Sequence, residues 1–385
     1  LLAGLGKAEG DDLRFSRGQV GFLDALLAAE PESTCDELFR QAREEWRRFE
    51  KLSPATEPPG FEGTLRGYQR EGLGWLHFLR QFGFGGCLAD DMGLGKTVQV
   101  LALLVTRQRE RESLPPKEAA RFPPSLVVAP RSVVFNWKRE AERFAPGLRV
   151  LDHSGLSRFK EAERFAGFDL VLTTYGTLRR DIVLLQEVGF DYVILDESQA
   201  IKNAATASAK AARLLRGRHR LALSGTPIEN HLGELWSLLE FLNPGLAGSA
   251  AVFSALAGQT GRPDEESRRL LGRALKPLIL RRTKAQVAKD LPAKLEQTLY
   301  CELENGQRER YDELKEHYRR SLLARVGREG MNKSRMHVLE ALLRLRQAAC
   351  HPGLIDRSLL PEPSAKLEML LPRLAQVTEE GHKAL

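Results

Sequence analysis

The 385-residue chain is 42 % hydrophobic and 28 % charged, with four scattered cysteines and a net charge of +7 from 58 basic and 51 acidic residues. This composition predicts a globular protein with two or three domains and well-buried cores, and the sequence contains no run of eighteen apolar residues that could cross a bilayer. The cysteines lack CxxC spacing, which argues against a zinc site and a disulfide framework, and the modest basic excess is compatible with nucleic acid as a partner without establishing it.

Residues 1–60 are predicted to form a helical leader that ends in a linker. Apolar residues recur at helical spacing over 16–29 and 34–51, and the three prolines of residues 53–60 then break the pattern. The first residue is leucine, and an acidic pair stands where a signal peptide has its apolar core. We therefore expect the chain to be a piece of a longer protein.

The second leader helix has a start signal and an apolar stripe. Thr34 and Glu37 have the spacing of a capping box, which would satisfy the first backbone N–H groups of the helix. Leu38, Trp46 and Phe49 are the residues expected to form its buried face.

Residues 61–290 alternate short apolar runs with helical stretches. The runs that read as strands are "GGCLAD", "SLVVAP", "LRVLDHS", "FDLVLTTY", "FDYVILDES" and "RLALSGTP". Near-continuous apolar strands alternating with helices predict an α/β fold with a parallel sheet covered on both faces. After the last of these strands we expect a helical insertion at about 232–280, including a helix over 267–280, then one strand within 290–303 in a mostly helical segment over 291–385.

Polar residues gather where the predicted strands end. In parallel sheets, ligands bind beyond the carboxyl ends of the strands, so these residues are predicted to share one site. They are Asp90, Asp91, Pro130, Arg131, Thr173, Thr174, Asp196, Glu197, Ser224 and Thr226.

The first of these strand ends leads into "DDMGLGKTVQ", which departs from the phosphate-loop pattern GxxxxGK[ST] because Asp90 stands at the first glycine. The context is that of a phosphate loop nevertheless, since a strand precedes it and an apolar helix follows. Gly93 and Gly95 would turn backbone N–H groups toward phosphates, Lys96 would reach the β and γ phosphates, and Thr97 would ligate Mg²⁺. A flexible glycine turn is the alternative interpretation. The loop residues expected to bind nucleotide are Asp91, Met92, Gly93, Leu94, Gly95, Lys96, Thr97 and Val98.

Two further strand ends carry residues suited to hydrolysis. Asp196 would hold the magnesium shell, and Glu197 would orient and deprotonate an attacking water. The hydroxyls of Ser224 and Thr226 in "SGTP" would couple this site to movement. Alone, each motif is more often a solvated edge or an ordinary turn, and their weight comes from occurring together with the phosphate loop.

The motifs occur in the order "LRGYQ", "DDMGLGKT", "LVVAPRSVVFNW", "LTTYGTL", "LDESQAIKN", "LSGTPIEN" and "LRRTKAQV". This ordered set resembles the SWI/SNF-type branch of superfamily-two helicase-like ATPases over about residues 65–300, and "LRLRQAACHPGL" at 343–354 resembles the helical opening of that family's second lobe. Asp90 in place of the glycine is normal for the family. The resemblance implies a RecA-like three-layer P-loop lobe, ATP and Mg²⁺ as cofactors, and double-stranded DNA as a partner.

The resemblance also implies roles for residues outside the loop. Gln69 would read the adenine edge with support from Arg66, although Gly67 departs from the proline usual at its position. Gln199 replaces the commoner histidine and would link the nucleotide to "SGTP" as a coupling residue.

The nucleic-acid contacts are expected at strand ends whose hydroxyls and backbone N–H groups suit phosphates, which position a strand without reading its sequence. Trp137 is expected to pack in the core, whereas stacking on bases and packing both remain open for Tyr175. Residues 268–290 carry eight basic residues against one acidic and would face either DNA or the other lobe. The candidate contacts are Arg131, Asn136, Thr173, Thr174, Tyr175 and Asn230.

Together these features predict a leader over 1–60, a RecA-like ATP-binding lobe over 61–290 and the helical start of a truncated second lobe over 291–385. The predicted function is the ATP-hydrolysing motor lobe of a double-stranded-DNA translocase, poorly active alone because the second lobe's arginine is expected to be missing. An RNA helicase of the DEAD-box sort and a non-hydrolysing DNA- or protein-binding module are the alternatives. We expect a monomer with DNA-bound proteins as further partners, no membrane association, and a bacterial cytoplasmic location, or a nuclear one in a eukaryote.

Overall fold

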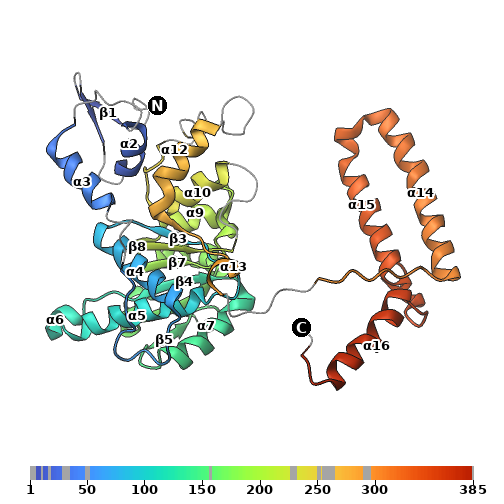
Figure 1. The fold of residues 1–385 in the computed structure, drawn as a ribbon, viewed down its shortest axis with the longest axis horizontal. Helices are drawn as coiled ribbons and strands as arrows, with labels where there is room; N and C mark the ends of the chain where they lie inside the picture. The colour runs from blue at the N-terminus through green and yellow to red at the C-terminus, as the bar shows by residue number, and fades with distance from the viewer. Residues whose placement is uncertain are drawn as a thin grey trace. The chain divides into compact units, whose positions relative to one another are not determined.

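The computed structural model describes residues 6–9, 12–15, 19–27, 35–47, 53–155, 158–225, 232–248, 253, 265–288 and 296–383. The chain divides into two compact units, Leu1–Leu291 and Pro292–Leu385. The first contains the main sheet, and the described part of the second is mostly helical (Figure 1). None of the described helices is both long and apolar enough to pass through a membrane.

The first unit is organised by a seven-stranded sheet in the order β5-β6-β4-β7-β8-β3-β9, in which every pair of neighbours is parallel. Six strands are those that the sequence predicts, whereas β9 lies inside the segment expected to be helical. The strands are β3 (Gly86–Leu88), β4 (Ser125–Ala129), β5 (Val150–Asp152), β6 (Leu170–Thr174), β7 (Gly189–Leu195), β8 (Arg216–Leu223) and β9 (Ile279–Leu280).

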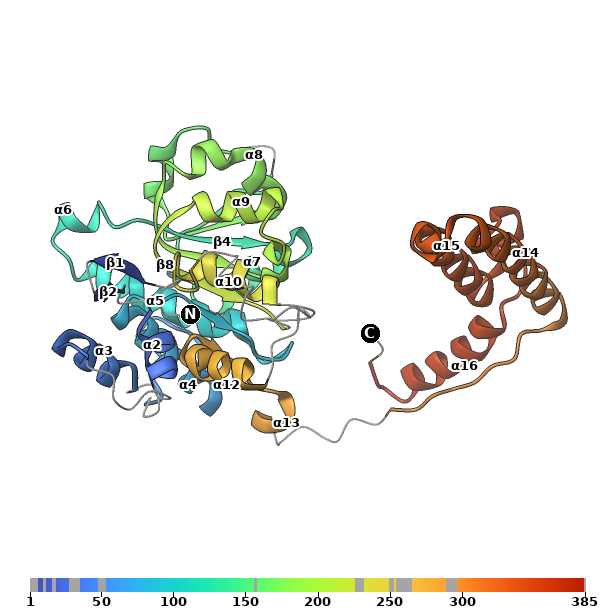
Figure 2. The ribbon, with the colours of Figure 1, turned by 90° about the horizontal axis from the view of Figure 1, so that it is seen from above.

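Both faces of the sheet are buried, as the apolar runs predict. In β4, Val127 and Ala129 belong to one apolar cluster and Leu126 and Val128 to another, because successive side chains point to opposite faces. The first cluster is covered by α4 (Gly67–Phe82), α5 (Lys96–Glu112) and α7 (Arg131–Phe144), and the second by α8 (Tyr175–Leu185) and α9 (Ala207–Leu214). Figure 2 shows α8 and α9 on one side of the sheet and α4 on the other. The predicted α/β three-layer fold is therefore confirmed.

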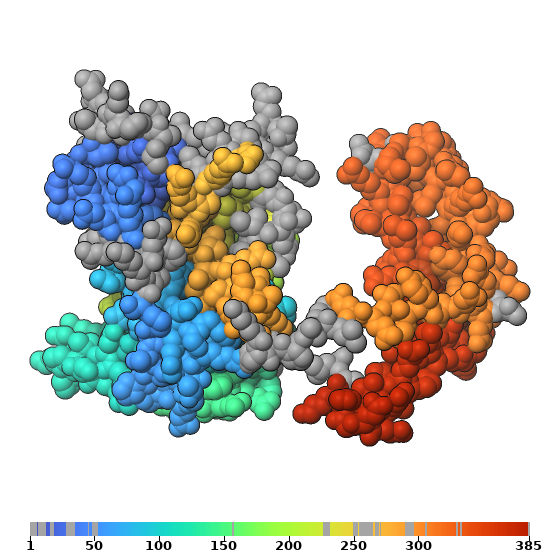
Figure 3. Space-filling model, viewed as in Figure 1, coloured from blue at the N-terminus to red at the C-terminus, as the bar shows by residue number. Residues whose placement is uncertain are grey.

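The leader adds a short hairpin of β1 (Lys7–Glu9) and β2 (Asp12–Arg14) and two helices, α2 (Val20–Leu27) and α3 (Glu37–Arg47). The helix α2 packs against α12 (Glu265–Leu275), and Figure 3 shows the blue leader beside the gold α12.

The stripe predicted for α3 is partly wrong. Trp46 is 6 % exposed as expected, but Leu38 is 76 % exposed. Phe39 and Ala42 pack on the core with Trp46, so the buried stripe is centred on these three residues and Leu38 lies at its exposed edge. Thr34 and Phe49 lie outside the described residues.

After β8 the first unit continues with α10 (Leu232–Leu242), α12 and the short α13 (Lys284–Val287). The second unit contains α14 (Asn305–Glu329), α15 (Met331–Cys350) and α16 (Ala365–Glu379). The strand expected within 290–303 is absent from residues 296–303, and its first residues lie outside the described part of the chain. An isolated apolar run forms no strand without a neighbouring strand to pair with, and the described residues of the second unit offer none.

Candidate active site

The segment from Ala89 to Gly95, which we call the phosphate loop, joins β3 to α5. Gly93 and Gly95 have φ of +83° and +73°, values that favour glycine, and α5 begins directly after Gly95. The N-terminal backbone N–H groups of a helix are unsatisfied within the helix and carry positive potential, so this geometry suits an anion. Among the other predicted loop residues, the Leu94 side chain is buried and that of Met92 is exposed, which leaves Met92 its backbone as a binding group.

Lys96 is the first residue of α5, and its ammonium lies over the loop. Its Nζ donates to the backbone carbonyl oxygens of Asp90 at 2.7 Å and Asp91 at 3.4 Å. These are neutral acceptors, so a phosphate oxygen that enters the loop offers the ammonium a stronger partner.

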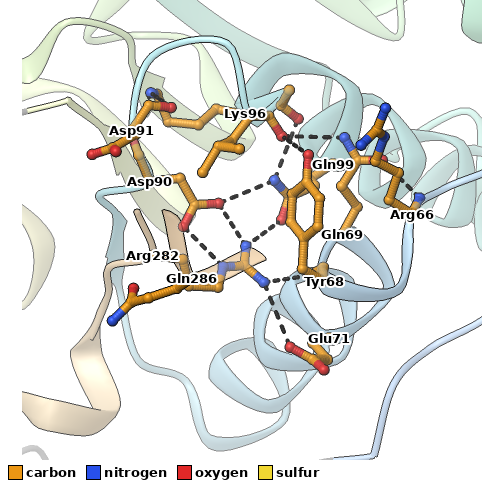
Figure 4. A network of polar contacts seen from close by, with 12 residues as sticks. Arg66, Tyr68, Gln69, Glu71, Asp90, Asp91, Lys96, Gln99, Arg282 and Gln286 are labelled. Atoms are coloured by element: carbon orange, nitrogen blue, oxygen red, sulfur yellow. Dashed lines mark hydrogen bonds and ion pairs between the residues drawn. The ribbon is translucent and has the colours of Figure 1, made fainter. Parts of the chain in front are cut away.

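Asp90, the residue that departs from the phosphate-loop pattern, is fully buried, and both oxygens of its carboxylate accept hydrogen bonds. Arg282 donates from Nε to Oδ1 at 2.9 Å and from Nη2 to Oδ2 at 2.5 Å, and Gln99 Nε2 donates to Oδ2 at 3.3 Å. Figure 4 shows this network between the phosphate loop, α4 and the chain around Arg282 (Figure 4). A glycine in place of Asp90 would leave the buried guanidinium without its carboxylate.

Gln69 lies against the phosphate loop. Its Oε1 accepts from the Arg66 backbone N–H at 2.9 Å, and its Nε2 donates to the carbonyl of Leu94 at 3.1 Å. The Tyr68 hydroxyl donates to the same carbonyl at 3.2 Å. A side-chain amide has two N–H groups and two acceptor lone pairs, so beyond its bonds to described residues Gln69 keeps one donor and one acceptor for a base edge. The predicted role of Gln69 at adenine is compatible with this geometry and stays a prediction.

Asp196 follows β7 and is buried beside Lys96. The indole Nε1 of Trp137 donates to its Oδ2 at 2.8 Å, and the backbone N–H of Glu197 donates to its Oδ1 at 2.9 Å. Burial raises the pKa of Asp196, while these two hydrogen bonds and the charge of Lys96 oppose the rise. Trp137 packs in the core as predicted, and it also orients this carboxylate.

Glu140 is a site residue that the sequence reasoning missed. It lies one turn after Trp137 in α7, and its carboxyl group contacts the Thr97 hydroxyl. Burial raises its pKa and the nearby Asp196 carboxylate adds to the rise, whereas Thr97 lowers it. Its Oε2 is buried and has no hydrogen-bond partner among the residues that the structure describes. The sequence offered one signal for Glu140, since it lies three residues after Trp137, which was expected to be buried, and residues at this spacing are neighbours on a helix.

The residues around Thr97 fit a magnesium ion. Thr97 supplies a hydroxyl, Asp196 supplies a carboxylate, and the free oxygen of Glu140 adds a second carboxylate beside them. Mg²⁺ prefers oxygen ligands and binds through one or two carboxylates together with water and substrate phosphates. This donor set matches an ion that arrives with a nucleotide.

Glu197 lies in a left-handed conformation, with φ of +48°, and is the only non-glycine residue of the described chain with positive φ. Gln199 Nε2 donates to its Oε2 at 2.7 Å, and the Ser224 hydroxyl donates to Gln199 Oε1 at 3.4 Å. Backbone strain of this kind costs about 1–3 kcal/mol and occurs mainly at functional sites. The predicted coupling residues Gln199 and Ser224 are thus linked to Glu197, whereas Thr226 lies outside the described residues.

The predicted nucleic-acid residues divide into exposed and buried groups. Arg131 and Asn136 are exposed on α7, and Thr174 is half-buried, with its hydroxyl accepting from the Thr177 backbone N–H at 3.1 Å. Asn230 lies outside the described residues.

Two of the expected contacts require correction in this structure. The Thr173 side chain is fully buried and its hydroxyl donates to the His153 carbonyl at 2.9 Å, because both faces of the sheet are covered at this position of β6. Tyr175 is buried too, and its hydroxyl donates to the Asp196 carbonyl at 2.8 Å, so its ring packs instead of offering a stacking surface.

Comparison with known proteins identifies the family. Residues 68–354 match the model of the SNF2-related domain. The chain belongs to this family. It is 39 % identical over 348 residues to the putative ATP-dependent helicase/translocase YwqA of Bacillus subtilis, covering 87 % of this chain and 36 % of that protein. It is 32 % identical over 352 residues to the TATA-binding protein-associated factor MOT1 of Saccharomyces cerevisiae, covering 85 % of this chain and 19 % of that protein.

A solved structure shares the fold of this SNF2-family chain. The SWI2/SNF2 ATPase core of Sulfolobus solfataricus in complex with dsDNA aligns with a TM-score of 0.55 at 35 % identity, covering 86 % of this chain and 67 % of that chain. The predicted family and the RecA-like fold are therefore confirmed. The chain spans about a third or less of the length of these two curated relatives.

Proposed function

We propose that this SNF2-family chain binds ATP with Mg²⁺ at the phosphate loop and serves as the ATP-hydrolysing motor lobe of a double-stranded-DNA translocase. One observation carries the proposal, namely that Lys96, Thr97 and Asp196 lie near one another beyond the carboxyl ends of the strands although they follow two different strands, β3 and β7. The similarity to YwqA and to the Sulfolobus core in complex with dsDNA supports it.

The chain's own residues supply the parts that hydrolysis needs. The ammonium of Lys96 would hold the β and γ phosphates, and Thr97 and Asp196 would hold Mg²⁺, which neutralises charge on the phosphates when bound. Glu197 would orient the attacking water and accept its proton, with Gln199 fixing one carboxylate oxygen at 2.7 Å. The link from Gln199 to Ser224 would transmit the state of the nucleotide to the next strand end.

Exchange of Glu197 tests the proposed chemistry. We expect Glu197→Gln to keep the affinity for Mg-ATP while it abolishes single-turnover hydrolysis, because the phosphate and metal ligands remain and only the base is lost. Glu118→Gln, at an exposed residue of the short helix Pro116–Ala119, is the matched control and should leave both unchanged. Hydrolysis by Glu197→Gln at the wild-type rate would place the base elsewhere.

The DNA partner is tested by binding. The exposed candidates Arg131 and Asn136 would contact phosphates, so affinity for duplex DNA should be independent of sequence and fall steeply with salt. Fluorescence anisotropy at equal salt should rank duplex DNA above RNA of the same length. A preference for RNA would support the RNA-helicase alternative, and a preference for one DNA sequence would contradict phosphate contacts.

A further inference from the structure

The segment Ile279–Val287, which we call the strap, runs beside the phosphate loop although it lies about 190 residues further along the chain. β9 pairs in parallel with β3, and the contact continues past the strand ends. The Ala89 N–H donates to the Leu280 carbonyl at 2.7 Å, and the Asp91 N–H donates to the Arg282 carbonyl at 3.0 Å. The Lys284 N–H in turn donates to Asp91 Oδ2 at 3.0 Å.

Arg282 reinforces this contact from within the core. Only 8 % of the residue is exposed, and its guanidinium bonds both oxygens of Asp90, the Gln99 Oε1 at 3.0 Å and the Tyr68 carbonyl. Gly72 of α4 leaves the space for this arrangement, since a Cβ there would lie 1.9 Å from Gln99 Oε1. The planar guanidinium is suited to such a bidentate contact, whereas an ammonium cannot reproduce it.

The same two aspartates hold Lys96. Its Nζ bonds the carbonyls of Asp90 and Asp91, and these are the residues that the strap fixes through a side chain and through the backbone. The position of the ammonium therefore depends on the strap. Without Arg282, the fully buried Asp90 carboxylate would lose its cation and repel entering phosphates.

We propose that Arg282 is a positioning residue that holds the phosphate loop in the shape that accepts nucleotide, and that nucleotide binding in turn stabilises the strap. The inference rests on the proposed binding of ATP at this loop. The two effects must be reciprocal, because a contact that favours the binding-competent loop is itself favoured by the ligand. The strap is followed by the chain that leads into the second unit, so it is placed to carry the nucleotide state along the chain.

The chain offers a matched control in a second buried pair. Arg107 Nε and Nη2 donate to the two oxygens of the fully buried Asp191 at 2.7 and 2.8 Å. Asp191 lies near the amino end of β7, whereas Asp196 follows its carboxyl end. Arg107→Lys therefore removes the same kind of bidentate contact as Arg282→Lys does. It does so near the amino ends of the strands, whereas the phosphate loop follows the carboxyl end of β3.

Two readouts test the proposal with Mg-ADP carrying a fluorescent ribose group as the probe. We expect Arg282→Lys to weaken binding about tenfold, and Arg107→Lys to bind as the wild type does even though both lower the melting temperature. In hydrogen exchange, Mg-ADP should protect the strap amides of the wild type and of Arg107→Lys, and protect them less in Arg282→Lys. A merely structural role of Arg282 would lower stability without this selective change.

If Arg282→Lys does not fold, the double variant Asp90→Asn with Arg282→Gln can be tested in its place. Neutral amides then replace the ion pair and leave no buried charge unpaired. It should show the same loss of affinity and of strap protection. Wild-type affinity and protection in a folded Arg282→Lys or in the double variant would overturn the inference while leaving the proposed function intact. Failure of the wild type to bind Mg-ADP would overturn the proposed function and the inference with it.

Discussion

Alanine substitutions at Gly93 and Gly95 separate two demands that the phosphate loop places on its glycines. Both residues have similar positive φ, so an alanine at either carries a similar backbone strain of about 1–2 kcal/mol. Their surroundings differ. A Cβ at Gly93 would be 3.6 Å from the Lys284 side chain, an ordinary contact, whereas a Cβ at Gly95 would be 2.5 Å from Gln69 Nε2.

The difference can be converted into a free energy of unfolding. At 2.5 Å the Gln69 amide must move, and it then loses its bonds to the Leu94 carbonyl and the Arg66 N–H. Each such bond contributes about 1 kcal/mol net. We therefore expect Gly95→Ala to lower the free energy of unfolding by about 1–2 kcal/mol more than Gly93→Ala does.

Urea unfolding followed by tryptophan fluorescence measures this difference. The four tryptophans, at positions 46, 75, 137 and 236, all lie in the first unit, so the signal follows the unit that contains the loop. In a Gln69→Ala background the two glycine variants should become equally stable, since the displaced amide is gone. Equal stabilities in the wild-type background, or a difference that survives Gln69→Ala, would show that the Gln69 amide does not cause the difference.

Two further predictions follow from buried titratable groups. Burial lowers the pKa of His77, His153 and His219 below 6.5, so as pH falls below 6.5 the unfolded chain takes up protons that the folded chain does not, and the melting temperature should drop between pH 7.5 and 5.5. Each histidine lowers the free energy of unfolding by at most about 1.4 kcal/mol per pH unit. His153→Gln should therefore reduce the drop in melting temperature, and a drop of the same size in that variant would contradict a contribution from His153. Burial also raises the pKa of the Cys87 thiol to about 12, so iodoacetamide at pH 8 should leave Cys87 unmodified in the native protein and modify it once urea unfolds the chain. Peptide mass spectrometry detects the modification, and labelling of Cys87 in the native protein would be inconsistent with the fold.

The strands and the phosphate loop were predictable because their signals are local. Each of the six strands contains a short apolar run that polar residues follow, and the strand before "GLGKT" and the helix after it identify that segment as a phosphate loop. The two-residue strand β9 was missed because its short apolar run also fits the end of the helix expected over 267–280. Its pairing with β3, a contact that is distant in sequence, defines it as a strand.

The site was predicted less completely, because several roles depend on partners far away in sequence. Asp90 could be recognised as a departure from the phosphate-loop pattern, but its reason lies in Arg282, 192 residues later. Thr173 and Tyr175 have side chains that suit nucleic acid, yet both are buried, Thr173 within the covered sheet and Tyr175 at the start of α8. Burial of this kind is decided by packing and not by residue type.

Titration calorimetry of Mg-ATP into the chain and into Lys96→Ala tests most directly whether this is a nucleotide-binding lobe. Lys96 bonds neutral carbonyls in the phosphate loop, and it is the one lysine of the loop and its helix start placed to meet the phosphates. We expect one Mg-ATP bound per wild-type chain, and no measurable binding by a Lys96→Ala variant that still unfolds cooperatively. Equal affinities for the two proteins would contradict this expectation.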